Sequence, residues 1–103
     1  MNTAIPDVPA GALAGSTFEE WDNEFRTLYS THRSITGPIS VVTVYASAIQ
    51  RPNGTIEDGT VGDAPRVWCD FEGGGDGMVT SQARELAAAL LAAADLADRW
   101  VQR

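Results

Sequence analysis

The sequence predicts an α+β domain in the order helix, strand, strand, helix, with a small antiparallel sheet packed by two helices. Three segments carry this prediction. Residues 39–49 and 65–72 are rich in β-branched and aromatic side chains, as strands are. Residues 78–101 are rich in Ala and Leu and contain neither Gly nor Pro, which favours a long helix.

The N-terminal quarter predicts an arm followed by a helix. Residues 1–15 are rich in Pro, Gly and Ala, and we expect a flexible arm before a single domain over residues 16–103. Thr17 and Glu20 have the spacing of a capping box, in which each side chain bonds a free backbone amide. Aromatic and apolar residues then recur at helical spacing, which predicts a first helix over residues 18–31.

Both faces of the strand over residues 39–49 are largely apolar. Val42 and Val44 lie on one face and Val41 and Tyr45 on the other, so we expect both faces to be covered. Two or three strands are too few to be stable alone in water. We therefore expect a symmetric homodimer that completes the sheet, with Val44 and Trp68 at or near its interface.

The C-terminal segment predicts the second helix. Thr80 suits the N-cap, and Arg99 in the last turn complements the helix dipole. One stripe of side chains should pack against the sheet, formed by Leu86, Leu90, Ala93, Ala97 and Trp100.

Composition narrows the classes of function. The chain has 103 residues, which fits one domain, and a formal net charge of −7. That charge argues against binding a nucleic-acid backbone and favours a basic protein partner. No apolar stretch approaches the length of a membrane span and the first residues do not resemble a secretory signal, so we expect a cytoplasmic protein without membrane contact.

No motif predicts catalysis, a cofactor or a metal. The Gly-rich run at residues 73–77 lacks the Gly-Lys-Ser/Thr ending of a phosphate-binding loop. The acidic residues between 57 and 63 do not have EF-hand spacing. Cys69 is the only cysteine, and no motif joins it to His32 as a nucleophile and base. We therefore expect a protein that is not an enzyme.

The first predicted helix is the candidate docking surface. Its carboxylates would attract a basic partner, and exposed aromatic side chains beside them would anchor it. The alternative is a solvated acidic face over a core stripe of aromatics. The candidate partner-binding residues are Glu19, Glu20, Trp21, Glu24 and Phe25.

Residues 82–98, together with Pro65, Val67, Thr80 and the Ala93-Ala94-Asp95 run, resemble small actinobacterial and mycobacteriophage proteins of unknown function. The resemblance implies an accessory protein of a bacterium or its phage and brings no activity with it. The leading hypothesis is a small acidic protein-interaction module that binds and modulates a host or phage protein. The alternative is a structural or assembly component, such as a minor virion protein or a self-associating scaffold.

Overall fold

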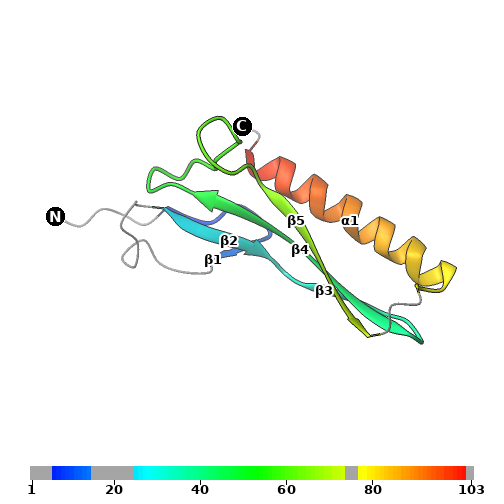
Figure 1. Cartoon of the computed structure of the whole chain (residues 1–103). Coiled ribbons are helices and arrows are strands. Elements are labelled where there is room, and N and C mark those ends of the chain that lie inside the picture. Colours follow the sequence, from blue (N-terminus) through cyan, green and yellow to red (C-terminus); the bar gives the residue numbers. More distant parts are fainter. Residues whose placement is uncertain (1–5, 15–24, 74–76, 102–103) are drawn as a thin grey trace.

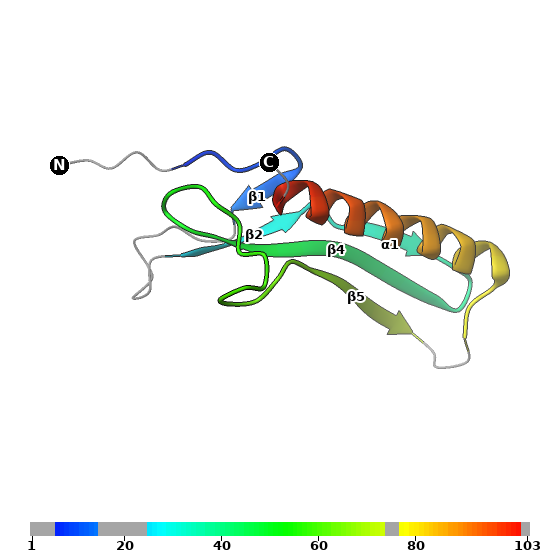
Figure 2. The same ribbon diagram turned by 90° about the horizontal axis from the view of Figure 1, so that it is seen from above.

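The computed structural model describes residues 6–14, 25–73 and 77–101. Within them an antiparallel sheet is packed by one C-terminal helix, which lies across one face of the sheet (Figures 1 and 2). The α+β class is confirmed. The elements are β1 (Ala12–Ala14), β2 (Arg26–Ser30), β3 (Arg33–Thr36), β4 (Ser40–Gln50), β5 (Arg66–Gly73) and α1 (Thr80–Val101).

Strand β4 is the centre of the sheet. It pairs with β2 and β3 along one edge and with β5 along the other, and β1 pairs with the outer side of β2. Tyr29 lies opposite Ser47 and Arg33 lies opposite Val44, so three residues between β2 and β3 face two residues of β4. This is the count of a β-bulge. The Ser30 hydroxyl accepts a hydrogen bond from the Ala46 amide at 2.8 Å, which satisfies that amide where the ladder is interrupted.

The core lies between β4 and α1. Every second residue of β4 is buried, including Val42 and Ala46, and these side chains are small enough to let the helix come close. Leu28 and Trp100 fill the core near the C-terminal end of α1. The predicted stripe on the helix is confirmed: Ala97 and Trp100 are buried, and three further members pack half-buried against the core, Leu86, Leu90 and Ala93.

Both ends of α1 are tied to the rest of the domain by side-chain hydrogen bonds. Near the first turn, the Gln82 amide donates to the carbonyl groups of Ile35 at 3.1 Å and Ser40 at 3.0 Å. At the last turn, the Trp100 indole donates to the carbonyl of Ala10 at 3.0 Å. These bonds fix the position of the helix along the sheet.

Residues 6–14 belong to the folded domain, although the sequence places them in an arm. Gln50 is fully buried, accepts a hydrogen bond from Arg26 Nε at 2.8 Å and donates to the Asp7 carbonyl at 2.9 Å. Arg26 also donates to the Pro6 carbonyl at 2.6 Å. These bonds draw the N-terminal segment onto the β2–β4 pair, where no local sequence pattern would place it.

The first predicted helix is wrong where the structure describes it, because residues 26–30 form strand β2. Leu28 is buried and Tyr29 is not, which is the alternation of a strand. The apolar residues from 25 to 29 fit a helical period equally well, so periodicity alone could not decide. The pairing with β4 decides in favour of a strand. Residues 18–24 of that predicted helix lie outside the described residues.

Candidate functional site

The sheet face opposite α1 carries a row of aromatic side chains, and no described element lies across it. Tyr29 comes from β2, His32 from the bulge, Tyr45 from β4 and Trp68 from β5. Tyr45 and Trp68 are directly opposed in the β4–β5 register, and their neighbours in sequence point to the helix side. We call this side of the sheet the open face, and these four residues the aromatic ladder.

The aromatic ladder is held together by ring contacts centred on Tyr45. The His32 ring stacks on Tyr45 with a centroid distance of 4.2 Å and an interplanar angle of 28°. Trp68 lies on another side with its ring centre 6.3 Å away and nearly parallel, at 12°. Tyr29 is tilted by 57° at 6.2 Å. The Trp68 indole donates to Ser47 Oγ at 2.7 Å, so the rings are positioned before any partner arrives.

A pocket of about 350 Å³ lies beside the aromatic ladder. Tyr29, Tyr45 and Trp68 form one part of its lining, and Asp63 and Arg66 form another. The last two make an ion pair at 3.2 Å, with both side chains more than half exposed. The pocket therefore combines apolar ring surface with charged groups that solvent reaches.

The charges on the open face are mostly negative. Asp70 and Glu72 alternate with Trp68 on the same side of β5, and Arg66 supplies the opposite charge at the start of the strand. Partial desolvation raises the pKa of the Tyr45 phenol, and the nearby Asp70 carboxylate raises it further. The phenol therefore stays neutral at physiological pH and keeps its hydrogen-bond donor.

The loop that supplies Asp63 is organised by a buried carboxylate. Glu57 is almost fully buried, and its Oε2 accepts hydrogen bonds from the Gly59 amide at 3.0 Å and the Val61 amide at 2.9 Å. Its other oxygen pairs with the Arg51 guanidinium. These contacts shape the loop at residues 51–65 beside the open face.

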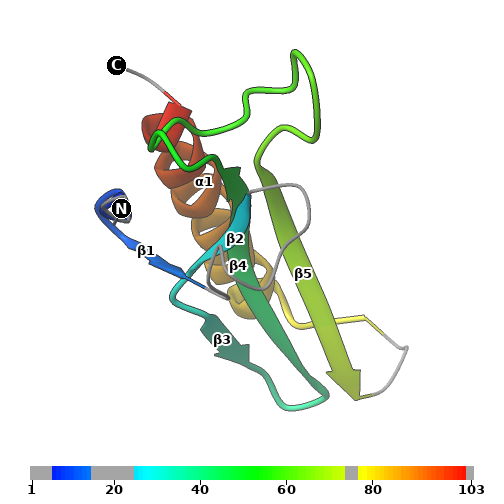
Figure 3. The same cartoon turned by 90° about the vertical axis from the view of Figure 1, so that its left-hand side faces the viewer.

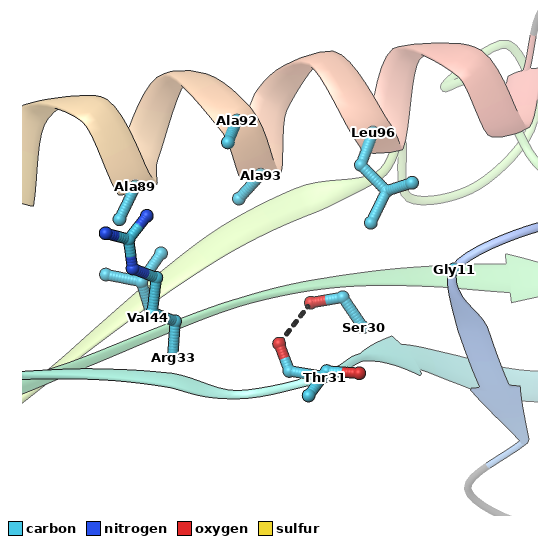
Figure 4. Close-up of a pocket in the computed structure, with 9 residues that line it drawn as sticks. All are labelled: Gly11, Ser30, Thr31, Arg33, Val44, Ala89, Ala92, Ala93 and Leu96. Carbon is cyan, nitrogen blue, oxygen red and sulfur yellow. Dashed lines mark hydrogen bonds between the residues drawn. The ribbon is translucent and has the colours of Figure 1, made fainter.

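A second pocket of about 250 Å³ lies on the other side of the sheet, between α1 and the bulge (Figure 4). Ala89, Ala93 and Leu96 line it from the helix, and Val44 and Arg33 from the sheet. Small side chains on α1 leave this space. Its lining is largely apolar, so the pocket offers few groups that could orient a ligand.

The two residues that the sequence assigns to a self-association surface, Val44 and Trp68, lie on opposite faces of the sheet. Val44 is 2% exposed and lies beneath α1, so within this chain it presents no exposed surface to a second copy. Trp68 is 40% exposed on the open face. The reason is the register: Val44 is opposite Cys69, whereas Trp68 is opposite Tyr45, so the two side chains point to opposite faces.

The predicted docking residues of the first helix are mostly beyond the described part of the chain. Glu19, Glu20, Trp21 and Glu24 lie outside the described residues. Phe25 is half-buried and lines a pocket with Arg51 and Val61. These residues stay predicted contributors to binding.

Sequence reasoning did not find the aromatic ladder. It placed Tyr45 and Trp68 on strand faces, but the register that brings them together depends on how β4 and β5 pair. The helix predicted over residues 18–31 would end just before His32, whereas His32 follows β2 and stacks on Tyr45. The available signal was the alternation within each strand, which marks Tyr45 and Trp68 as residues of one face only once the pairing is known.

Three further observations bear on the site. Among the described residues, no three His, Cys, Asp or Glu side chains come together in a group that could hold a metal ion. Within the same part of the chain, no helix has both the length and the apolar character that crossing a membrane requires. No family model, curated protein or solved structure matches this chain.

Proposed function

We propose that the chain is a small acidic protein-interaction module that binds a protein partner through the open face, and that it has no catalytic role. The observation that carries this proposal is the aromatic ladder, which is exposed and already ordered on a face that no described element covers. An accessory role in the cytoplasm of an actinobacterium, or of one infected by a phage, is part of the proposal and rests on the resemblance of residues 82–98.

Exposed aromatic side chains on a rigid sheet are suited to anchor a partner. Aromatic residues are enriched at the centres of protein interfaces because they bury large areas with few rotatable bonds. The hydrogen bond from Trp68 to Ser47 reduces the entropy that binding would otherwise cost. Asp70 and Glu72 beside Trp68, with the net charge of −7, favour a partner with a basic surface.

Affinity capture with matched variants tests this role. The bait is the full chain, and the test variant is Tyr45→Ala with Trp68→Ala. The control is Leu91→Ala, because Leu91 is 67% exposed on the helix, away from the sheet. We expect an actinobacterial lysate to yield partners that both the original chain and the control retain and that the double variant loses. Equal capture by all three baits would refute the open face as the docking surface.

The acidic segment before β2 is tested separately. Glu20→Arg with Glu24→Arg should slow association with a basic partner, and the loss should be greatest at low salt because solution ions screen these charges. Full binding by this variant at all salt concentrations would remove residues 19–24 from the docking surface and leave the open face unaffected.

A second candidate function is assembly of a structural component through self-association, which a homodimer would begin. The observation that favours it is the outer edge of β5. That edge pairs with no described residue (Figure 3). Phe71 on β5 is 60% exposed. Light scattering of the purified chain separates the outcomes: a defined dimer supports self-association that stops at two chains, long polymers support a scaffold, and a monomer excludes both forms of self-association.

A further inference from the structure

We propose that a second copy of this chain docks on the outer edge of β5, antiparallel and in a register centred on Cys69. The inference rests on the self-association proposed above and specifies its geometry. It is independent of whether the open face binds another protein.

The outer edge of β5 is exposed, so it can pair with a strand of a second copy. Strand β5 lies at one side of the sheet and pairs only with β4 among the described elements (Figure 3). All of its residues are exposed or half-exposed. An edge strand presents backbone N–H and C=O groups that a second strand can pair with. With its large apolar side chain at Phe71, β5 would gain both backbone hydrogen bonds and apolar burial from such pairing.

The sequence of β5 is complementary to itself in one register. With Cys69 opposite Cys69 of the second copy, Arg66 lies opposite Glu72 and Val67 lies opposite Phe71. Directly opposed residues of antiparallel strands share a face. Arg66 and Glu72 are both on the open face, and Val67 and Phe71 are both on the helix side. The two-fold axis repeats each pair, so the interface holds two ion pairs and two apolar pairs.

Neighbouring registers lack this complementarity. A shift that centres the axis on Asp70 places two Asp70 carboxylates opposite each other, which is unfavourable. A shift that centres it on Trp68 pairs Arg66 with Asp70 but leaves Phe71 beyond the paired segment of β5. Registers with the axis between two residues place Val67 opposite Glu72 or Asp70. Of these registers, only the one centred on Cys69 pairs both Arg66 with Glu72 and Val67 with Phe71, and it places Trp68 opposite Asp70.

Arg66 is available for this contact. Its ion pair with Asp63 joins two side chains that are 56% and 64% exposed, and exposed pairs of this kind contribute little to stability. Redirecting the guanidinium toward Glu72 of a second copy therefore costs little. The resulting dimer would have one continuous sheet, both helices on the same side, and the two aromatic ladders on the opposite side.

Charge reversal tests the register. Arg66→Glu alone and Glu72→Arg alone each place like charges opposite each other twice, so we expect the dimer to weaken about tenfold or more. An equimolar mixture of the two variants should recover a heterodimer, because every opposed pair then has opposite charges. Both changes in one chain should also restore the homodimer. Sedimentation equilibrium measures all four cases, and circular dichroism verifies that each variant is folded.

Cross-linking through Cys69 provides the second measurement. A short bis-maleimide should join two chains of the original protein through Cys69, whereas Cys69→Ser should give no product. A monomer at millimolar concentration overturns the inference and the self-association role together, and leaves binding by the open face untouched. If a dimer forms whose affinity the charge reversals do not change and which does not cross-link through Cys69, only the proposed register is overturned.

Discussion

The two faces of strand β4 differ in their surroundings: one packs against α1, and the other belongs to the open face. On the helix side, Val42, Val44 and Ala46 are almost fully buried. On the open face, Thr43 and Tyr45 are half-exposed and Tyr45 is the centre of the aromatic ladder. Aliphatic side chains of modest size let α1 approach, whereas rings and hydroxyl groups remain accessible on the other face. Changes on the helix side should therefore act on stability, and changes on the open face should act on binding.

The largest expected effect is on the helix side, at Trp100. It is 2% exposed in the core cluster with Leu28 and donates a hydrogen bond to Ala10. Trp100→Ala should lower the free energy of unfolding by about 3–5 kcal/mol. Chemical denaturation measures this loss, with Leu91→Ala as the control that should change little. A loss below that of Leu91→Ala would mean that the C-terminal turn of α1 does not pack on the sheet.

Leu90 is the next position on the same helix face. The sequence places it in the stripe that should pack against the sheet, and the structure leaves it half-buried against the cluster around Val42. Leu90→Ala should therefore cost about 2 kcal/mol, at the low end for such a truncation. Denaturation under the same conditions should rank it below Trp100→Ala. The reverse ranking would place the centre of the core nearer the start of α1.

Replacing Gln50 tests how much a buried polar side chain on the helix side of β4 contributes to stability. Its amide joins Arg26, Asp7 and the Gly54 carbonyl, so Gln50→Leu would remove their hydrogen bonds while keeping a similar volume. Leaving buried polar groups without partners should destabilise the domain by about 1–3 kcal/mol. Limited proteolysis should then cut residues 6–14 earlier than in the original chain. Unchanged cutting would show that β1 and Trp100 hold this segment without Gln50.

The sequence predicts the helix side of the molecule well because that side depends on local periodicity. The alternation in residues 39–49 marks Val44 and Ala46 as one face, and the Ala/Leu stripe marks the packed face of α1. Pairing is not local. Whether residues 26–30 form a helix or a strand, and whether Tyr45 meets Trp68, depends on the partner of each strand and its register. Patterns within single segments therefore could not predict the candidate site, because its residues come from different strands.

On the open face, replacing Trp68 should affect binding more than stability, whereas replacing Trp100 should act mainly on stability. Its ring packs against Tyr45 and its indole N–H donates to Ser47, but the residue is 40% exposed. Trp68→Ala should lower the free energy of unfolding by only about 1 kcal/mol, as expected for loss of one exposed aromatic pair. Binding to a captured partner, measured by calorimetry, should fall far more. A stability loss as large as that of Trp100→Ala would show that the aromatic ladder contributes to stability as a second core.

The smallest effect concerns Cys69, whose side chain is on the helix side while its neighbour Asp70 is on the open face. Burial raises the pKa of the Cys69 thiol, and the Asp70 carboxylate raises it further because a negative charge disfavours a thiolate. The thiolate is the reactive form, so alkylation of Cys69 should reach half of its maximum rate at a higher pH than for an unperturbed cysteine. Asp70→Asn removes the charge and should move this midpoint to lower pH, but only part of the way, since burial is the larger cause. Iodoacetamide alkylation followed across pH by mass spectrometry measures both midpoints. A midpoint that Asp70→Asn leaves unchanged would mean that the charge on the open face does not reach the thiol on the other side of β5.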